Sequence, residues 1–331
     1  MDTKPQSHLV EVQNLSVTFK LDESEVAAVQ NVSFHIDRGE TLALVGESGS
    51  GKSVTARAIM KLLPRTADVS GESRVLLAGT RIDQFSERQM LNVRGDRISM
   101  IFQEPMSSLN PIYRVGSQIA EAVVLHQRLT KRQALARALD LLKEVRIPEP
   151  EARLEQYPHQ LSGGQRQRVM IAMAIATDPD VLIADEPTTT LDVTTQARIM
   201  ELLDRIVEER GMGVILITHD LGLASSFCED MHVMYGGRIV ESGPAPAVLR
   251  TLVHPYSEAL LESICTIDRD VHRPIAAISG QPPLPDQLPS GCPFHPHCAY
   301  AQEVCVDVAP PPIPVDGRVT ECHFPLVGDR P

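Results

Sequence analysis

The stretch TLALVGESGSGKSVTARAIMKLL, residues 41–63, constrains the fold more than any other feature of the chain. The apolar run from Thr41 to Val45 predicts a strand, a glycine-rich turn follows, and a helix is expected from about Lys52. The turn fits the pattern G-x-x-x-x-G-K-[ST], in which backbone N–H groups converge on phosphates at a helix N-terminus. Its residues and the next helical one are Gly46, Glu47, Ser48, Gly49, Ser50, Gly51, Lys52, Ser53 and Val54. A strand, loop and helix in this order predict an α/β fold of the P-loop type.

The chemistry of this loop indicates ATP and Mg²⁺ as cofactors. Lys52 would reach the β and γ phosphates as a point charge, and the Ser53 hydroxyl would help to hold Mg²⁺. The alternative is a glycine-rich turn that binds nothing. A chance match in a chain of this length has a frequency of about one in a hundred, and the correct flanking elements lower it further.

A second motif, DPDVLIADEPTTTLD, lies far downstream at residues 178–192. It predicts a buried strand over 181–184 that ends on two carboxylates. Asp185 is placed to hold Mg²⁺, directly or through water, and Glu186 to polarise an attacking water as general base. An isolated Asp-Glu pair before a proline would more often be a solvated loop, but here the pair follows a P-loop.

A third motif, QLSGGQRQRVMIAMAIA, begins at Gln160 and predicts a helix capped by Ser162. Gly163 and Gly164 leave backbone N–H groups open for an anion, which gives the chain a second phosphate-binding helix terminus. On its own, a Ser-Gly-Gly sequence would be interpreted as a plain helix cap. Because it occurs together with the other two motifs, we favour the phosphate-binding role.

In this order the motifs resemble the ATP-binding subunits of ABC transporters, and Leu161 to Gln165 matches their signature LSGGQ. The resemblance implies an ABC nucleotide-binding domain with an antiparallel β subdomain and a helical subdomain at about residues 104–165. It also implies the family's remaining site residues: Gln103 for Mg²⁺, the D-loop from Thr190 to Asp192, His219 at the γ-phosphate, and Phe19 stacked on adenine. For Phe19, plain core packing is an equal alternative. Thr190 departs from the family, which often has Ala or Ser there.

The same resemblance implies a dimer for catalysis. In this family, two nucleotide domains pair head to tail, so that Ser162, Gly163, Gly164 and Gln165 of one cap the γ-phosphate held by the other. The helical subdomain receives the membrane subunits. A soluble ABC ATPase of translation or DNA repair is the rival class, but this chain has one cassette and no long coiled-coil insertion. A purely regulatory nucleotide-binding protein is disfavoured by the intact Glu186 and His219.

Composition narrows the partners and the compartment. The formal net charge is −12, without a cluster of Lys and Arg, which argues against nucleic acid as a partner. No apolar run reaches the roughly 18 residues of a membrane span, and MDTKPQSHLVEVQ lacks the apolar region of a signal peptide. We therefore expect the chain to stay in the cytosol, and the family resemblance implies that it is peripheral at the cytoplasmic face of the inner membrane.

The last 81 residues, 251–331, follow a nucleotide domain expected at 1–250. Their segments HPYSEALLESI, QPPLPDQLPS and GCPF resemble the C-terminal extension of the oligopeptide, dipeptide and nickel importer subgroup. The resemblance implies a second, usually unlike, ABC ATPase subunit as dimer partner, two integral membrane permease subunits and an extracytoplasmic substrate-binding protein. Dipeptides or oligopeptides are the expected cargo, with nickel or another small solute as the alternative.

Four cysteines of this extension are spaced C-x5-C-x6-C-x16-C. In a reducing cytosol such a cluster indicates metal or redox chemistry more than disulfides. Spacing alone leaves iron and sulfur, zinc, and unligated thiols open, and three nearby histidines keep zinc in play; the importer subgroup implies a [4Fe–4S] cluster. The cysteines are Cys292, Cys298, Cys305 and Cys322, and the histidines are His295, His297 and His323. We expect Cys228 and Cys265 to be small core residues.

Overall fold

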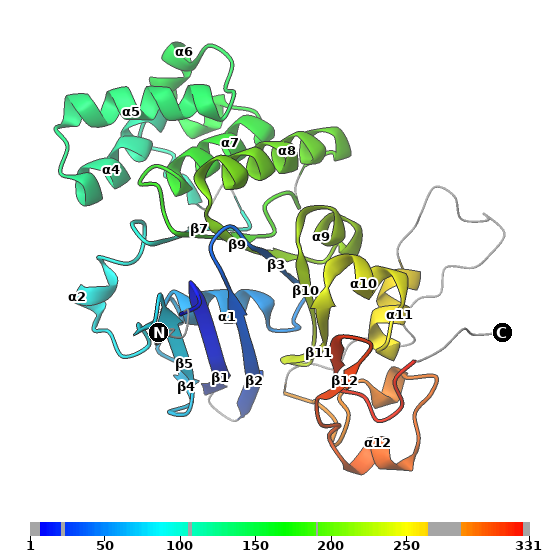
Figure 1. The fold of residues 1–331 in the computed structure, drawn as a ribbon. Helices are drawn as coiled ribbons and strands as arrows, with labels where there is room; N and C mark the ends of the chain where they lie inside the picture. The colour runs from blue at the N-terminus through cyan, green and yellow to red at the C-terminus, as the bar shows by residue number, and fades with distance from the viewer. Residues whose placement is uncertain (1–6, 21–23, 105–107, 190, 264–285, 327–331) are drawn as a thin grey trace, which may run out of the picture. The chain divides into compact units, whose positions relative to one another are not determined.

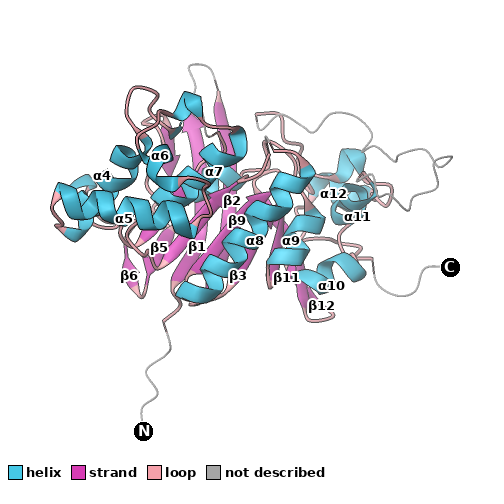
Figure 2. Ribbon diagram, turned by 90° about the horizontal axis from the view of Figure 1, so that it is seen from above, coloured by secondary structure: helices cyan, strands magenta, loops and turns pink. Residues whose placement is uncertain are grey.

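The computed structural model describes residues 7–20, 24–104, 108–189, 191–263 and 286–326. The chain forms two compact units that interleave along the sequence. The unit that we call the P-loop unit comprises Glu11–Phe34, Leu42–Val75 and Thr218–Pro331, and the helical unit comprises Met1–Val10, His35–Thr41 and Leu76–Ile217. Both units mix strands and helices, as Figure 2 shows by colour.

The sheet of the P-loop unit is ordered β12-β13-β11-β10-β3. Strand β10 runs parallel to β3, and every other neighbouring pair is antiparallel. All five residues of β3 are buried, which explains its unbroken apolar sequence. The strands are β3 (Thr41–Val45), β10 (Asp230–Tyr235), β11 (Arg238–Pro244), β12 (Ile313–Val315) and β13 (Arg318–Thr320). The last two come from the C-terminal extension, so the extension enlarges the sheet that carries the P-loop.

An antiparallel β layer also belongs to the P-loop unit. Strand β1 (Val10–Lys20) neighbours β2 (Glu25–Ile36) and pairs antiparallel with β4 (Ala67–Val69), with Phe19 opposite Ala67. This is the antiparallel β subdomain that the family resemblance implied. The helices of the unit are α1 (Lys52–Ile59), α9 (Leu221–Phe227), α10 (Ala245–Arg250), α11 (Pro255–Glu262), α12 (Glu303–Asp307) and the 3-10 turn η2 (His295–His297).

The helical unit is built on three parallel strands in the order β9-β8-β7. These are β7 (Ile98–Ile101), β8 (Val181–Asp185) and β9 (Gly213–Thr218), which are almost wholly buried. Strands β5 (Arg74–Leu77) and β6 (Thr80–Arg81) pair as an antiparallel hairpin. Parallel strands end at one common edge, so β7 and β8 present the residues that follow them side by side.

Except for α2, which is cyan, the helices of this unit are the green helices in Figure 1. Helix α5 shows why they form: Thr130 and Gln133 cap its start reciprocally, and Ala134, Ala138 and Leu141 bury one face at helical spacing. The helices are α2 (Glu87–Met90), α4 (Val115–Gln127), α5 (Lys131–Glu144), α6 (Pro150–Leu154), η1 (Pro158–Gln160), α7 (Gly163–Ala174) and α8 (Val193–Arg210).

The expected local elements are confirmed at the P-loop strand, the helix from Lys52, the strand before Asp185 and the helix after Ser162. Cys228 is buried, as expected. Cys265, Thr190 and part of the proline-rich connector lie outside the described residues. Among the helices that the structure describes, none has the length and apolarity needed to cross a membrane.

Candidate functional site

The side chain of Lys52 fills the centre of the P-loop. Its Nζ donates to the carbonyl oxygens of Gly46 and Glu47, each at 2.7 Å, and to Ser50 Oγ at 3.2 Å. The side chain is buried, although lysine rarely is. The loop therefore holds the ammonium group by carbonyl oxygens, in the place from which a P-loop lysine reaches phosphate oxygens.

Two glycines of the loop are required by close backbone contacts. A Cβ on Gly46 would lie 2.2 Å from the carbonyl oxygen of Met234, and one on Gly51 would lie 2.6 Å from that of Ala28. Gly51 also has a φ of 104°, in the left-handed region that other residues avoid. The remaining predicted residues of the loop follow the same course: Ser48 and Gly49 are exposed, and Ser53 and Val54 are half-buried in the first turn of α1.

The helical unit brings Gln103 and Glu186 together. Gln103 lies two residues beyond β7 and Glu186 one residue beyond β8, and the two strands are parallel neighbours. Gln103 Nε2 donates to Glu186 Oε2 at 2.9 Å. Asp185 is the last residue of β8, directly precedes Glu186 in the sequence, and is buried. The Mg²⁺ candidates Gln103 and Asp185 and the candidate base Glu186 thus share one edge of the sheet.

Thr189 is a site residue that the sequence argument missed. Its Oγ1 donates to the same oxygen, Glu186 Oε2, at 2.7 Å. Glu186 has a φ of 46°, and its N–H donates to the carbonyl of Ile217 at 2.9 Å. The backbone turns out of the strand at this residue, and two side chains then fix its carboxylate. A hydroxyl three residues after an acidic residue was the available signal, in the sequence EPTT.

The signature helix α7 begins as predicted. Ser162 Oγ accepts from the N–H of Gln165 at 3.3 Å, and Gln165 Oε1 accepts from the N–H of Ser162 at 3.0 Å. This capping box fixes the first turn, in which Gly163 and Gly164 follow the cap. Ser162 and Gly163 are exposed, so the helix terminus is open to solvent.

The D-loop residue Asp192 caps the neighbouring helix α8. Its carboxylate accepts from the N–H of Thr195 at 3.0 Å and from Thr195 Oγ1 at 2.7 Å. These hydrogen bonds, that of the Thr195 side chain first, lower the pKa of Asp192 below its ordinary value. A Cβ on Gly164 would lie 2.9 Å from Thr195 Cγ2, so the signature helix and the D-loop helix start in contact.

His219 and Phe19 belong to the P-loop unit. His219 directly follows β9 and is exposed, and the next residue, Asp220, caps α9 by accepting from the N–H of Leu223 at 3.0 Å. Phe19 is half-buried on β1 opposite Ala67.

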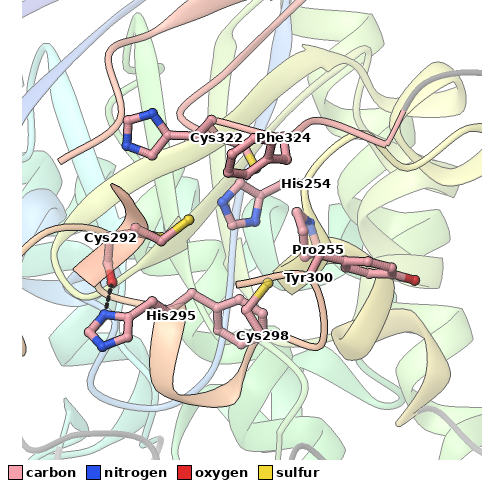
Figure 3. A pocket seen from close by; sticks show the side chains of 11 residues that line it. His254, Pro255, Cys292, His295, Cys298, Tyr300, Cys322 and Phe324 are labelled. Atoms are coloured by element: carbon pink, nitrogen blue, oxygen red, sulfur yellow. Dashed lines mark hydrogen bonds between the residues drawn. The ribbon is translucent and has the colours of Figure 1, made fainter. Parts of the chain in front are cut away.

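The C-terminal extension contains a second candidate site, a small pocket that is partly open to solvent (Figure 3). Cys292, Cys298, Cys305 and Cys322 all line it. The backbone explains part of this convergence, because the N–H of Cys292 donates to the carbonyl of Cys305 at 2.8 Å. Gly291, with a φ of 67°, permits the approach: a Cβ there would lie 2.3 Å from the same carbonyl oxygen.

Burial raises the pKa of three of these thiols, Cys292, Cys298 and Cys322, and that of Cys322 reaches about 11. Neighbouring cysteines raise each of them further, so the group would ionise only beside a positive charge. The described residues contain no set of three His, Cys, Asp or Glu side chains spaced for one metal ion. A single zinc with Zn–S bonds of 2.3 Å would need sulfurs about 3.8 Å apart. The predicted cysteines therefore converge on one cavity without the spacing of a single-ion site.

Two of the three histidines near these cysteines bond to the backbone. His295 Nδ1 lies 2.9 Å from the carbonyl oxygen of Cys292, and His323 Nε2 lies 2.9 Å from that of Val308. Each ring thus has one nitrogen engaged by the backbone, an arrangement that fixes the ring and is compatible with a metal bond at the other nitrogen.

Comparison with known proteins places the chain in a class and then in a family. Residues 29–189 match the ABC transporter family, and residues 240–305 match the C-terminal region of oligopeptide and dipeptide transporters. The chain is 45% identical over 318 residues to the oligopeptide transport ATP-binding protein OppD of Bacillus subtilis, covering 96% of this chain and 88% of that protein. It is 45% identical over 319 residues to the dipeptide transport ATP-binding protein DppD of Escherichia coli, covering 96% and 97%. The chain belongs to the ABC transporter ATP-binding proteins, in the group that carries the oligopeptide and dipeptide transporter C-terminal region.

The solved structures agree with this fold. The dimeric ATP-binding cassette MJ0796 in a post-hydrolysis state bound to ADP and Pi has a TM-score of 0.64 and 31% sequence identity, over 71% of this chain and 98% of that one. CbiO1 from Clostridium perfringens, part of the ABC transporter complex cbiONQ, has a TM-score of 0.63 and 28% identity, over 73% and 91%.

Proposed function

We propose that this protein is the ATP-hydrolysing subunit of an ABC importer for peptides. The observation that carries the proposal is the carboxylate of Glu186, which stands at the end of β8 and is held by Gln103 and Thr189. It occurs in a chain whose similarity to peptide-transport ATP-binding proteins extends through the C-terminal extension.

Each residue then has a defined task in hydrolysis. In the P-loop unit, the loop's N–H groups and Lys52 would hold the phosphates of ATP, and Ser53 would be a ligand for Mg²⁺. In the helical unit, Asp185 and Gln103 would be the Mg²⁺ ligands. Glu186 accepts a proton from the attacking water, and His219 orients the γ-phosphate. The bond between Gln103 and Glu186 supports this assignment, because it joins a Mg²⁺ ligand to the base that must act beside it.

The signature residues act on the nucleotide of a partner. Ser162 to Gln165 begin an exposed helix terminus, and Asp192 begins the helix in contact with it. One pairing surface would present both to the P-loop of a second ABC subunit, which we take to be an unlike ATPase. The remaining partners are two membrane permease subunits and an external peptide-binding protein, and the chain works at the cytoplasmic face of the membrane. Residues 1–250 form the nucleotide domain and 251–331 its extension.

The cargo class rests on the relatives, whose names are those of oligopeptide and dipeptide transport proteins. No contact in the described residues favours nickel or a function outside transport.

Replacement of Glu186 by Gln tests the proposal. The variant keeps the shape of the side chain and loses the proton acceptor, so MgATP binding should persist while hydrolysis falls by about 10²-fold or more. ATP should then hold the variant in the closed dimer, which size-exclusion chromatography with light scattering detects. Unchanged turnover in the variant would refute the assignment.

We propose Cys292, Cys298, Cys305 and Cys322 as the ligands of a [4Fe–4S] cluster, the group that the importer subgroup implies. Support comes from the four thiols, which all line one pocket although they are up to 30 residues apart in the sequence. When bound, a cluster supplies the positive charge that lets thiolates form, and it ties the extension together. A zinc ion is the alternative occupant.

A further inference from the structure

Three aromatic rings from separate segments form a buried cluster in the P-loop unit. Tyr235 ends β10, Tyr256 lies in the first turn of α11, and Phe294 lies between Cys292 and η2. Their ring centroids are 4.5 Å apart for Tyr235 and Tyr256, 5.3 Å for Tyr235 and Phe294, and 5.4 Å for Tyr256 and Phe294. All three side chains are buried. The cluster joins the strand beside β3 to the cysteine segment.

One polar group of this cluster contacts the P-loop. The hydroxyl oxygen of Tyr256 accepts a hydrogen bond from the backbone N–H of Glu47, at 3.0 Å. The carbonyl of Glu47 accepts in turn from Lys52 Nζ at 2.7 Å. The two peptide groups of Glu47 are thus held from opposite sides, one by the extension and one by the lysine that reaches the phosphates.

A second contact to the P-loop comes from the turn between β10 and β11. The N–H of Gly237 donates to the carbonyl of Ser50 in the P-loop at 3.1 Å. A Cβ on the preceding Gly236 would lie 3.1 Å from Pro293 of the cysteine segment. The turn therefore touches the P-loop on one side and the extension on the other.

The position of Tyr256 is itself fixed by buried polar groups. Its N–H donates to His254 Nδ1 at 3.0 Å, and the N–H of His254 donates to Glu241 Oε2 at 3.0 Å. Glu241 is fully buried and paired with Arg318 of β13. The start of α11 is therefore held by the strands of the sheet, which leaves Tyr256 little freedom.

We propose that Tyr256 is a positioning residue for nucleotide binding, through which the C-terminal extension holds the P-loop in its phosphate-binding conformation. The proposal rests on the function proposed above. A loop already ordered before ATP arrives loses less conformational entropy on binding. The contribution of one net hydrogen bond corresponds to about a two- to tenfold change in affinity.

The substitution Tyr256→Phe removes the acceptor and keeps the ring. The matched control is Tyr235→Phe, in the same cluster and equally buried, because the Tyr235 hydroxyl finds no hydrogen-bond partner among the described residues. In both variants the aromatic packing persists, and only in the first does the P-loop lose a contact. The affinity is measured by binding of a fluorescent ATP analogue to the full chain in the presence of Mg²⁺. The order of the P-loop without nucleotide is measured by amide hydrogen exchange of the peptide that contains Glu47.

Tyr256→Phe should weaken nucleotide binding by about two- to tenfold and speed amide exchange at Glu47, while kcat at saturating ATP stays within about twofold. Tyr235→Phe should leave both readouts at the wild-type value. Wild-type affinity and exchange in Tyr256→Phe would overturn the inference, as would equal effects of the two variants. Wild-type chain that binds no ATP would instead refute the proposed function, and the exchange readout would still decide the role of Tyr256.

Discussion

The substitution Arg318→Met removes one partner of a buried ion pair that fastens the C-terminal extension to the P-loop unit. Arg318 Nη1 lies 3.5 Å from Glu241 Oε1 and also donates to the carbonyls of Ala247 and Thr251. Glu241 accepts from the N–H groups of Val253 and His254 as well. Methionine keeps the length and the apolar stem of the side chain and removes the charge.

The cost follows from what becomes of Glu241. Burial already raises the pKa of this carboxyl above 4.5, against hydrogen bonds and the charge of Arg318, which lower it. Without Arg318 the cheapest escape is protonation, which at pH 7 costs up to about 3.4 kcal/mol for a group of unfolded pKa 4.5. The wild type already bears part of this cost, because the pKa of its Glu241 is itself raised. Lost hydrogen bonds to two carbonyls add about 1 kcal/mol each. We expect the free energy of unfolding to fall by about 3–5 kcal/mol, the range found when buried pairs are broken.

Glu241 also sets how the stability of the variant depends on pH. The folded-state pKa of Glu241 is higher in the variant than in the wild type, so the variant loses stability as pH rises above the unfolded pKa. At pH 5 protonation costs only about 0.7 kcal/mol, so the deficit of the variant should shrink, by at most about 2.7 kcal/mol because the wild-type pKa is raised as well.

Urea unfolding followed by tyrosine fluorescence measures this deficit, since the chain has no tryptophan and the P-loop unit holds Tyr235, Tyr256 and Tyr300. The control Arg250→Met removes an exposed charge at the end of α10 and should change stability by less than about 0.5 kcal/mol. A loss below about 1 kcal/mol at pH 7, or a deficit that grows at pH 5, would refute the reasoning.

Two further predictions concern other parts of the chain. Burial alone would raise the pKa of Asp180, but the hydrogen bonds and charges of Arg97 and Arg38 lower it below 3.8. The stability that this carboxylate contributes is therefore present above pH 3.8 and is lost as the pH falls below it. Asp180→Asn should flatten the acid limb of a thermal-melting profile. Protein purified without oxygen should be brown, with absorbance near 400 nm and about four irons per chain. Cys298→Ser should bleach it and expose the extension to protease while ATP binding changes little; one zinc per colourless chain would select the alternative ion.

Much of the nucleotide site could be predicted from the sequence because its signals are local. The strand before Gly46, the helix from Lys52, the cap at Ser162 and the end of β8 at Asp185 each depend on residues within a few positions. Local hydrophobic pattern and capping chemistry decide such elements.

The extension could not be predicted to the same depth, because its contacts are distant in sequence. Tyr256 bonds to a residue 209 positions away, and β13 pairs with β11 in a register that only the folded chain sets. The segments β12 and β13 are three residues each, too short for alternation to identify them as strands. Cysteine spacing likewise gave the four candidate ligands without the cavity that gathers them.

The most direct test of the proposed function is phosphate release by the chain assembled with its permease subunits in vesicles. The account predicts that MgATP hydrolysis rises when a peptide-loaded external binding protein is added, and that Glu186→Gln lowers it by about 10²-fold or more with nucleotide still bound. The proposed function would be contradicted if the hydrolysis rate did not change on addition of the peptide-loaded protein, or if the Glu186→Gln variant hydrolysed ATP at the wild-type rate.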